Sequence, residues 1–483
     1  MIRSFLHAIR QNGFIANISK LMSGTVIAQA IGLLITPILT RIYAADAFGE
    51  AALFMSISSI IGVVVCLKYE LAIVIPKEDD EAAALFGVSF FAVMFVSLIV
   101  AAVTLPGKTL VVDLFKQPSF SAHVVWLPFM IFLLGINLIL NYWNSRRNAF
   151  GRNAVARVAM SITTQGTKLG GGIFGPASGG LLIGAQIFGQ FVSSLMQIFL
   201  AWRDKTIIIN NNLSLAAMKQ AALKYRKFPI YSSWTGLLNT ASQQMPVLVM
   251  SFFFESSIIG YYALGVGILS LPMSLIAASV SQVFYQKACT IRANKGKEIS
   301  SKIYINLFAL GFLPFAFITL YGRELFTVVF GAQWEIAGSY AQMLSIWTLF
   351  MFMARPLSMI ISVYELQKIG LVLQINLFVL RIGGVVIGGV VGSPYLAVIL
   401  FSITGAVHCF LASLWYIHVA GGSVLNVLKE STYIAACGIA LLGAHYLLYQ
   451  NLLKNFIWFV VLSIIIAIFY YLAIRKKIVL YNV

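Results

Sequence analysis

Carboxylates are scarce in this 483-residue chain, which has 15 Asp and Glu against 33 Lys and Arg. Charged residues of both signs make up 10% of the sequence, whereas hydrophobic residues make up 60%. A soluble globular domain carries about 25% charged residues, so the composition excludes that class. Apolar runs long enough to cross a bilayer recur along the whole length. We therefore predict an all-α polytopic membrane protein.

Cysteine and histidine are also rare. The four cysteines, Cys66, Cys289, Cys409 and Cys437, are scattered, and the five histidines are equally dispersed. Their spacing fits neither a disulfide framework nor a metal site. The sequence also lacks a basic patch with interleaved aromatics on a soluble face, which argues against nucleic-acid binding. We predict no cofactor, no metal site and no nucleic-acid partner.

Fourteen apolar runs are long enough to span a bilayer, and no separate soluble domain remains between them. If the amino terminus is cytoplasmic, 25 of the 33 Lys and Arg lie in cytoplasmic segments, five in external segments and three in the membrane. This bias follows the positive-inside rule, so we expect both termini to be cytoplasmic. The predicted spans are 21–42, 48–68, 83–105, 122–142, 153–174, 179–201, 230–253, 258–286, 303–322, 337–363, 368–391, 394–418, 432–449 and 455–474.

The two halves of the chain repeat one another. Ser23 and Pro37 in span one are 14 residues apart, as are Ser232 and Pro246 in span seven. Gly49 and Gly260 open spans two and eight in matching contexts. The run Thr167-Lys168-Leu169-Gly170-Gly171 in span five also matches Leu380-Arg381-Ile382-Gly383-Gly384 in span eleven.

Six spans, an even number, separate the members of each matched pair. The halves therefore share one orientation and are related by a pseudo-twofold axis along the membrane normal, as in transporters built from parallel repeats. We predict an N-terminal six-helix lobe at 1–202 and a C-terminal six-helix lobe at 230–420. A cytoplasmic linker at 203–229 joins them, and two extra helices follow in 421–483.

Three basic residues are predicted to lie inside the bilayer: the repeat mates Lys168 and Arg381, and Arg355 in span ten. An intramembrane charge is expensive and usually faces a bundle interior or a water-filled cavity. Lys and Arg donate hydrogen bonds and cannot accept them, so the set favours an anion, and Arg is well matched to phosphate. The alternative is that these residues bond carbonyls or snorkel at kinks.

Two further features predict a water-filled cavity and helices that bend around it. Asn239 and Gln243 continue a polar row on one face of span seven, which could hydrogen-bond sugar hydroxyls or join helices. Pro37 and Pro246 are repeat mates inside spans and are the hinge candidates, with a static kink as the alternative. The basic linker could bind anionic membrane lipids, although ordinary positive-inside loading explains it as well.

The amino-terminal part of the chain resembles bacterial polysaccharide translocases, which include lipid-linked oligosaccharide and O-antigen flippases. These proteins belong to the multidrug/oligosaccharidyl-lipid/polysaccharide exporter superfamily. Over the rest of the chain, the likeness rests on span count, the repeat and charge placement. The segments that carry the amino-terminal resemblance are Lys20-Leu21-Met22-Ser23-Gly24-Thr25, Pro37-Ile38-Leu39-Thr40-Arg41-Ile42-Tyr43, Phe48-Gly49, and Tyr69-Glu70-Leu71-Ala72-Ile73-Val74 with Pro76.

The resemblance implies a bacterial inner-membrane transporter rather than an enzyme. It implies alternating access that carries an undecaprenyl-pyrophosphate-linked repeat unit from the cytoplasmic to the periplasmic leaflet, for O-antigen, lipopolysaccharide or capsule synthesis. The family's cationic cavity would map onto Lys168, Arg355 and Arg381, with Arg41 near the external mouth. The two extra helices resemble those that hold the polyprenyl tail in some relatives.

The resemblance also implies coupling to a proton or sodium gradient. No Asp or Glu lies in the central part of any predicted span, so the coupling residue is unassigned. We expect the chain to work as a monomer that contacts other polysaccharide-assembly proteins. Two alternatives stay open: a cation-coupled multidrug exporter of the same superfamily, and a membrane glycosyl transferase or polymerase acting on the same lipid.

Overall fold

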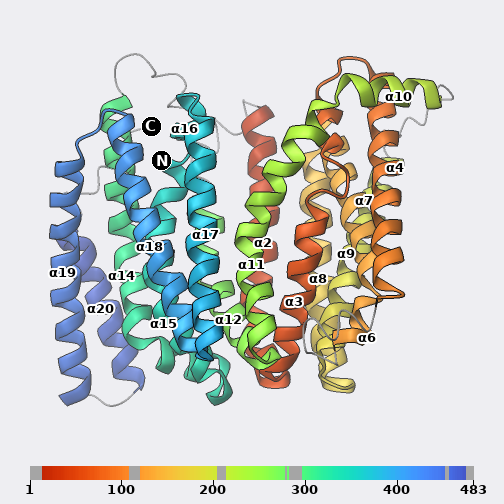
Figure 1. Cartoon of the computed structure of the whole chain (residues 1–483). Helices are drawn as coiled ribbons and strands as arrows, with labels where there is room; N and C mark the ends of the chain where they lie inside the picture. Colours follow the sequence, from red (N-terminus) through yellow and green to blue (C-terminus); the bar gives the residue numbers. More distant parts are fainter. Residues whose placement is uncertain are drawn as a thin grey trace. The chain divides into compact units, whose positions relative to one another are not determined.

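The computed structural model describes residues 13–107, 120–203, 214–277, 280–281, 296–451 and 456–474. Every regular element in these ranges is a helix, which agrees with the all-α prediction. Each of the fourteen predicted spans overlaps a helix (Figure 1). The ends of the chain, predicted to be cytoplasmic, lie outside the described residues, as do residues 204–213 of the predicted linker.

The chain divides into two compact units, and the first comprises residues 1–263 and 329–334. In this unit α2 packs on α8, α8 on α9, α4 on α7, and α3 on both α9 and α11. Its elements are α2 (Gly13–Ile42), α3 (Ala45–Gly62), η1 (Tyr69–Val74), α4 (Asp79–Thr104), α6 (Ser121–Val124), α7 (Leu127–Arg146), α8 (Phe150–Phe174), α9 (Gly179–Arg203), α10 (Leu215–Lys224), η3 (Phe228–Ser232), α11 (Ser233–Phe253), most of α12 (Ser256–Leu269) and η5 (Ala332–Trp334).

The second unit comprises residues 264–328 and 335–483. Here α18 packs on both α15 and α17, and α19 packs on α20. Its elements are η4 (Met273–Ala277), α14 (Gly296–Phe330, whose last two residues belong to the first unit), α15 (Glu335–Leu357), α16 (Ile360–Val363), α17 (Gln367–Val391), α18 (Pro394–Val419), α19 (Val424–Asn451) and α20 (Phe456–Ile474). The predicted boundaries of the two six-helix lobes stay a prediction.

Ten helices in the described ranges are long and apolar enough to cross a membrane, and α12 and α20 contribute shorter apolar stretches. On α4, Phe91, Phe95 and Leu98 are exposed at helical spacing, as expected for a face covered by lipid. The helix α8 is not among the ten, because Gly, Ser, Thr, Gln and basic residues interrupt its apolar sequence. This more polar helix packs along both α2 and α9.

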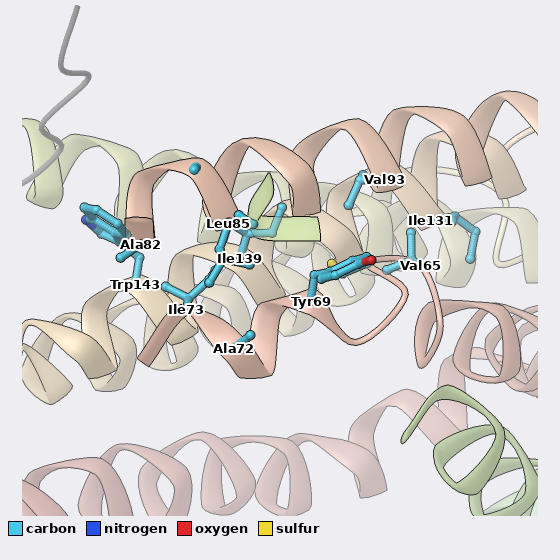
Figure 2. Packing of buried hydrophobic residues seen from close by; sticks show 13 residues of the cluster. Val65, Tyr69, Ala72, Ile73, Ala82, Leu85, Val93, Ile131, Ile139 and Trp143 are labelled. Carbon is cyan, nitrogen blue, oxygen red and sulfur yellow. The ribbon is translucent and has the colours of Figure 1, made fainter. Parts of the chain in front are cut away.

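The chain leaves the helical path at the end of α3. Leu67 and Lys68 have positive φ values of 50° and 62°, and a short 3₁₀ helix, η1, follows. This segment packs through Tyr69 and Ile73 on Leu85 of α4 and Trp143 of α7, within the hydrophobic cluster of Figure 2. Full burial of such side chains contributes about 1.5–3 kcal/mol each, which holds the left-handed turn in place.

A buried network of amides and hydroxyls joins α7, α8 and α9. Asn137 on α7 donates to the carbonyl oxygen of Gln190 at 3.1 Å and accepts from Ser193 and Gln197 at 2.8 and 2.7 Å. Asn144, about two helical turns further along α7, donates to Asn153 of α8 at 2.8 Å. All five side chains are buried, so the network fixes these three helices as one block.

Candidate functional site

Lys168 lies six residues before the end of α8, on the face that packs against α2. Its side chain is half-buried, and the Tyr43 hydroxyl donates to its carbonyl oxygen at 2.6 Å. No described carboxylate lies within ion-pair distance of the Lys168 ammonium. The helix ends at Phe174, so Lys168 is about 9 Å from that end by helical rise.

Arg157 is a second cation on α8 that sequence reasoning counted with the cytoplasmic residues. It lies seven residues inside the helix, and its guanidinium donates to the Thr25 hydroxyl of α2 at 2.6 Å. Arg157 and Lys168 are eleven residues apart, which places them on one helix face about 16 Å apart along the axis. Ser161 lies between them and donates to the Ala28 carbonyl oxygen of α2 at 2.8 Å. We call Arg157, Ser161 and Lys168 the polar α8 face.

Arg381 is the repeat mate of Lys168 but has a different environment within the second unit. It is only 3% exposed. Its guanidinium carbon lies 4.7 Å from the ring centroid of Trp347 on α15 and 5.2 Å from that of Phe401 on α18. Each such cation–π contact is worth about 0.5–2 kcal/mol, so aromatic stacking offsets part of the cost of burying this charge.

Gly405 makes room for this stack. A Cβ at Gly405 would lie 2.7 Å from Cδ1 of Trp347 and 3.2 Å from Nε of Arg381. The guanidinium therefore reaches between α15 and α18 only because α18 has no side chain there. On α17, Arg381 lies ten residues before Val391, about 15 Å from the helix end by helical rise. The repeat mates thus differ in depth along their own helices by about 6 Å.

The other predicted cations are exposed. Arg355 lies in the last turn of α15, two residues before the helix ends at Leu357, and a turn then leads into α16. The predicted span 337–363 is therefore two helices. Arg41 lies in the last turn of α2 and is also exposed.

The predicted polar row and hinges lie on α2 and α11. Asn239 and Gln243 are exposed on α11, and the Gln243 amide donates to the Asn239 side-chain oxygen at 3.4 Å. Both α2 and α11 continue through their prolines, Pro37 and Pro246. In the first unit, no hydrogen bond or ion pair among the described residues joins Lys168 to Asn239 or Gln243. Asn239 and Gln243 instead contact each other within one helix.

The first turns of α3 and α12 touch through glycines in the first unit. A Cβ on Gly49 would overlap the carbonyl oxygen of Ser256 and lie 3.1 Å from the Gly260 nitrogen. A Cβ on Gly260 would overlap the carbonyl oxygen of Ala45 and lie 3.0 Å from the Gly49 nitrogen. Only glycine permits this approach, which closes the end of the unit at which α2 and α11 finish.

Trp334 covers this glycine contact. Its ring meets Phe48 edge to face at 4.9 Å and Tyr261 at 5.8 Å, and its indole N–H donates to the Thr40 carbonyl oxygen at 2.8 Å. Phe48 precedes Gly49, and Tyr261 follows Gly260. The aromatic side chains therefore seal the point where the two helix starts meet.

Two buried carboxylates of the first unit lie near helix ends, outside the central parts of the spans. Glu50 is 8% exposed, and Nδ1 of His123 on α6 lies 3.9 Å from it. Glu70 in η1 is 1% exposed, and the Lys68 ammonium lies 3.7 Å from it. Burial raises the pKa of the Glu70 carboxyl, and Lys68 opposes that rise. The sequence places neither carboxylate in the central part of a predicted span, and it did not predict their burial.

The acidic run Glu78-Asp79-Asp80-Glu81 spans the N-cap and first turn of α4. Arg146, the last residue of α7, and Arg147, which follows it, each contact Asp79 at 3.0 Å, and Lys224 of α10 pairs with Glu81. Negative charge at a helix start complements the helix dipole. These pairs give the run a structural role that ties α7 and α10 to α4.

A family model described as "Polysaccharide biosynthesis protein" matches residues 38–338. No curated protein matches the chain. Among solved structures, the lipid II flippase MurJ in an inward closed conformation has a TM-score of 0.73 at 15% identity, covering 95% of this chain and 99% of that one.

Two transporters of the MOP superfamily are also similar in fold. An inward-facing multidrug resistance MATE family transporter has a TM-score of 0.61 at 16% identity, covering 84% of this chain and 99% of that one. A transporter from Pyrococcus furiosus, described as having a binding pocket of reverse polarity, has a TM-score of 0.56 at 14% identity, covering 86% and 98%. These similarities confirm the predicted fold class, and the family model supports the resemblance to bacterial polysaccharide translocases.

Proposed function

We propose, because the chain belongs to the polysaccharide biosynthesis protein family, that it is a flippase for a lipid-linked oligosaccharide. The substrate we propose is an undecaprenyl-pyrophosphate-linked repeat unit of O-antigen or capsule. The chain would carry it from the cytoplasmic to the periplasmic leaflet of a bacterial inner membrane. The fold shared with a lipid II flippase supports a transporter rather than an enzyme.

The polar α8 face carries this proposal. It presents Lys168 and Arg157 in a membrane protein whose described carboxylates pair with neither. Positive charge without a carboxylate partner favours an anionic ligand, and a pyrophosphate offers several acceptor oxygens. The two cations, about 16 Å apart on one face, would contact the head group successively along α8.

The remaining predicted residues fit later steps of the same transport. Asn239 and Gln243 would hydrogen-bond sugar hydroxyls, because both are exposed amides on α11. Arg355 would contact the phosphates from the end of α15, and Arg381 would reach them only after leaving its aromatic stack. Arg41 would receive the head group at the external end of α2.

Alternating access would use the glycine contact as its external closure. Gly49 and Gly260 meet where α2 and α11 end, and Pro37 and Pro246 lie five and seven residues before those helix ends. A proline leaves one helical hydrogen bond unmade, so bending there costs little. We propose that α2 and α11 bend at these prolines to part the glycines. The apolar pair α19 and α20 would hold the polyprenyl tail.

A reconstituted flipping assay tests the proposal. Purified protein in proteoliposomes should move a lipid-linked oligosaccharide between leaflets. Lys168→Ala should slow this about tenfold or more, because a charge-assisted hydrogen bond is worth about 1.5–3 kcal/mol. Lys219→Ala, which removes an exposed charge on α10, should leave the rate unchanged. A wild-type flipping rate in Lys168→Ala would contradict the proposed anion site.

A cation-coupled drug exporter is the second candidate, because Glu50 and Glu70 are buried carboxylates that such a transporter could use. Each already has a basic neighbour, His123 or Lys68, which weakens its use for a cationic drug. Drug-resistance profiles of a deletion strain would separate the two functions. Raised drug sensitivity together with normal surface polysaccharide would favour the exporter.

A further inference from the structure

We infer that Glu70 is a reversible proton-binding site, and that its protonation state controls whether the Lys68 side chain stays in contact with both η1 and α11. The inference deepens the proposed function, because it assigns the coupling residue of the flippase. It begins from a buried carboxylate that the substrate path does not use. Glu70 is 1% exposed, and its Oε2 has no hydrogen-bond partner among the described residues.

The only charged group beside Glu70 in the described structure is Lys68. The Lys68 ammonium is 3.7 Å from Oε1, which is an ion pair longer than a hydrogen bond. A buried carboxylate with one distant partner and one unsatisfied oxygen favours its neutral form. A sodium ion would need several oxygen ligands and would be repelled by Lys68, so the geometry points to a proton.

Other ionisable groups also lie near η1. Cys66 precedes it, and Tyr142 approaches from α7. Arg146, also on α7, donates to the carbonyl oxygens of Ile73, Lys77 and Glu78, and to Asp79 at the start of α4. From η3 the only ionisable side chain is the exposed Tyr231. Glu70 therefore has Lys68 as its ionic partner, and the hydrophobic cluster of Figure 2 packs around η1.

Lys68 links this pair to α11. A Cβ on Gly236 of α11 would lie 2.9 Å from Cε of Lys68, so the side chain lies across the helix where it has no side chain of its own. Leu67 and Lys68 hold left-handed backbone, which costs about 1–3 kcal/mol per residue when the surroundings enforce it. Protonation of Glu70 removes the negative charge that holds the Lys68 ammonium. Lys68 then no longer connects η1 to α11.

Infrared spectroscopy of the reconstituted full chain tests the proton site directly. A carboxylic acid C=O stretching band should titrate with pH in the wild type and be missing in Glu70→Gln. It should persist in Glu50→Gln, the matched change at the other buried carboxylate. Lys68→Met should shift the band's midpoint to higher pH, because the stabilising cation is gone. Gly236→Ala should shift it in the same direction, and Leu67→Gly should leave it unchanged.

An unchanged titrating band in Glu70→Gln would overturn the inference, as would an unchanged midpoint in Lys68→Met if Glu70→Gln does not fold. An unchanged midpoint in Gly236→Ala would overturn the link to α11. Flipping is then measured across pH in proteoliposomes. Wild-type flipping should depend on pH and Glu70→Gln flipping should not; equal pH dependence overturns the coupling role while the flippase function stands. If the wild type does not flip the lipid, the flippase function fails, whereas the infrared bands still decide the proton site.

Discussion

Gly49 and Gly260 touch through their backbones, and they are also equivalent positions of the internal repeat. A Cβ on either one would overlap a carbonyl oxygen of the other helix, that of Ser256 or Ala45. The same offset of 211 residues separates Gly49 from Gly260 and Ala45 from Ser256. The contact is therefore symmetric under the repeat, because equivalent backbone atoms of the two halves of the sequence meet there.

Gly49→Ala is expected to force this contact open. The added methyl would overlap backbone, which moves only if α3 and α12 separate. A cysteine placed at Ser256 should then react faster with a membrane-impermeant thiol reagent. Gly184→Ala on α9, where a Cβ meets nothing within 4 Å, is the matched control and should leave the reaction rate unchanged. Equal labelling in both variants would contradict a closed gate at Gly49.

Gly405→Ala is expected to destabilise the second unit. Its Cβ would push Trp347 and Arg381 apart and weaken a cation–π contact of about 0.5–2 kcal/mol. The thermal unfolding midpoint in detergent should fall. Gly383→Ala on α17, where a Cβ meets no neighbour, should hold or raise it because alanine favours helix. If the unfolding midpoint of Gly405→Ala were as high as that of Gly383→Ala, the close packing of Gly405 against Trp347 and Arg381 would be refuted.

Arg381→Met separates a structural from a substrate-binding role. An apolar side chain of similar length fits between Trp347 and Phe401, and replacing a buried charge by an apolar residue is often neutral for stability. We expect folding close to the wild type and loss of flipping. The unfolding midpoint and the flipping rate are both measured. Normal flipping in a folded variant would limit Arg381 to packing.

Glu70→Gln is expected to stabilise the folded state near neutral pH. Burial raises the folded-state pKa of Glu70 above its unfolded value of about 4.3, so the folded state binds the proton more tightly. Wild-type stability is therefore lost as pH rises from the unfolded to the folded pKa. The advantage of the variant should shrink as pH is lowered. Denaturant unfolding at several pH values measures the difference in unfolding free energy between the variant and the wild type. A difference that grows as pH falls would contradict the raised pKa of Glu70.

The sequence predicted the helices and the internal repeat better than it predicted the surroundings of individual side chains. Each predicted span overlaps a helix, because a bilayer imposes a minimum apolar run. Apolar length did not predict the aromatic stack on Arg381, since Trp347 and Phe401 come from other helices at no regular spacing. Arg157 was counted with the cytoplasmic charges because it lies near a span end, although its spacing of eleven from Lys168 was a usable signal. Burial of Glu70 depended on the chain folding back after α3.

The amide network of α7, α8 and α9 has a consequence for how the chain is made. Asn137 and Asn144 find their partners on α8 and α9, which are synthesised later than α7. Until those helices arrive, α7 would expose unsatisfied amides to hydrocarbon, which is costly. The three helices are therefore expected to leave the insertion machinery together, so a ribosome stalled between α7 and α9 should leave α7 poorly integrated.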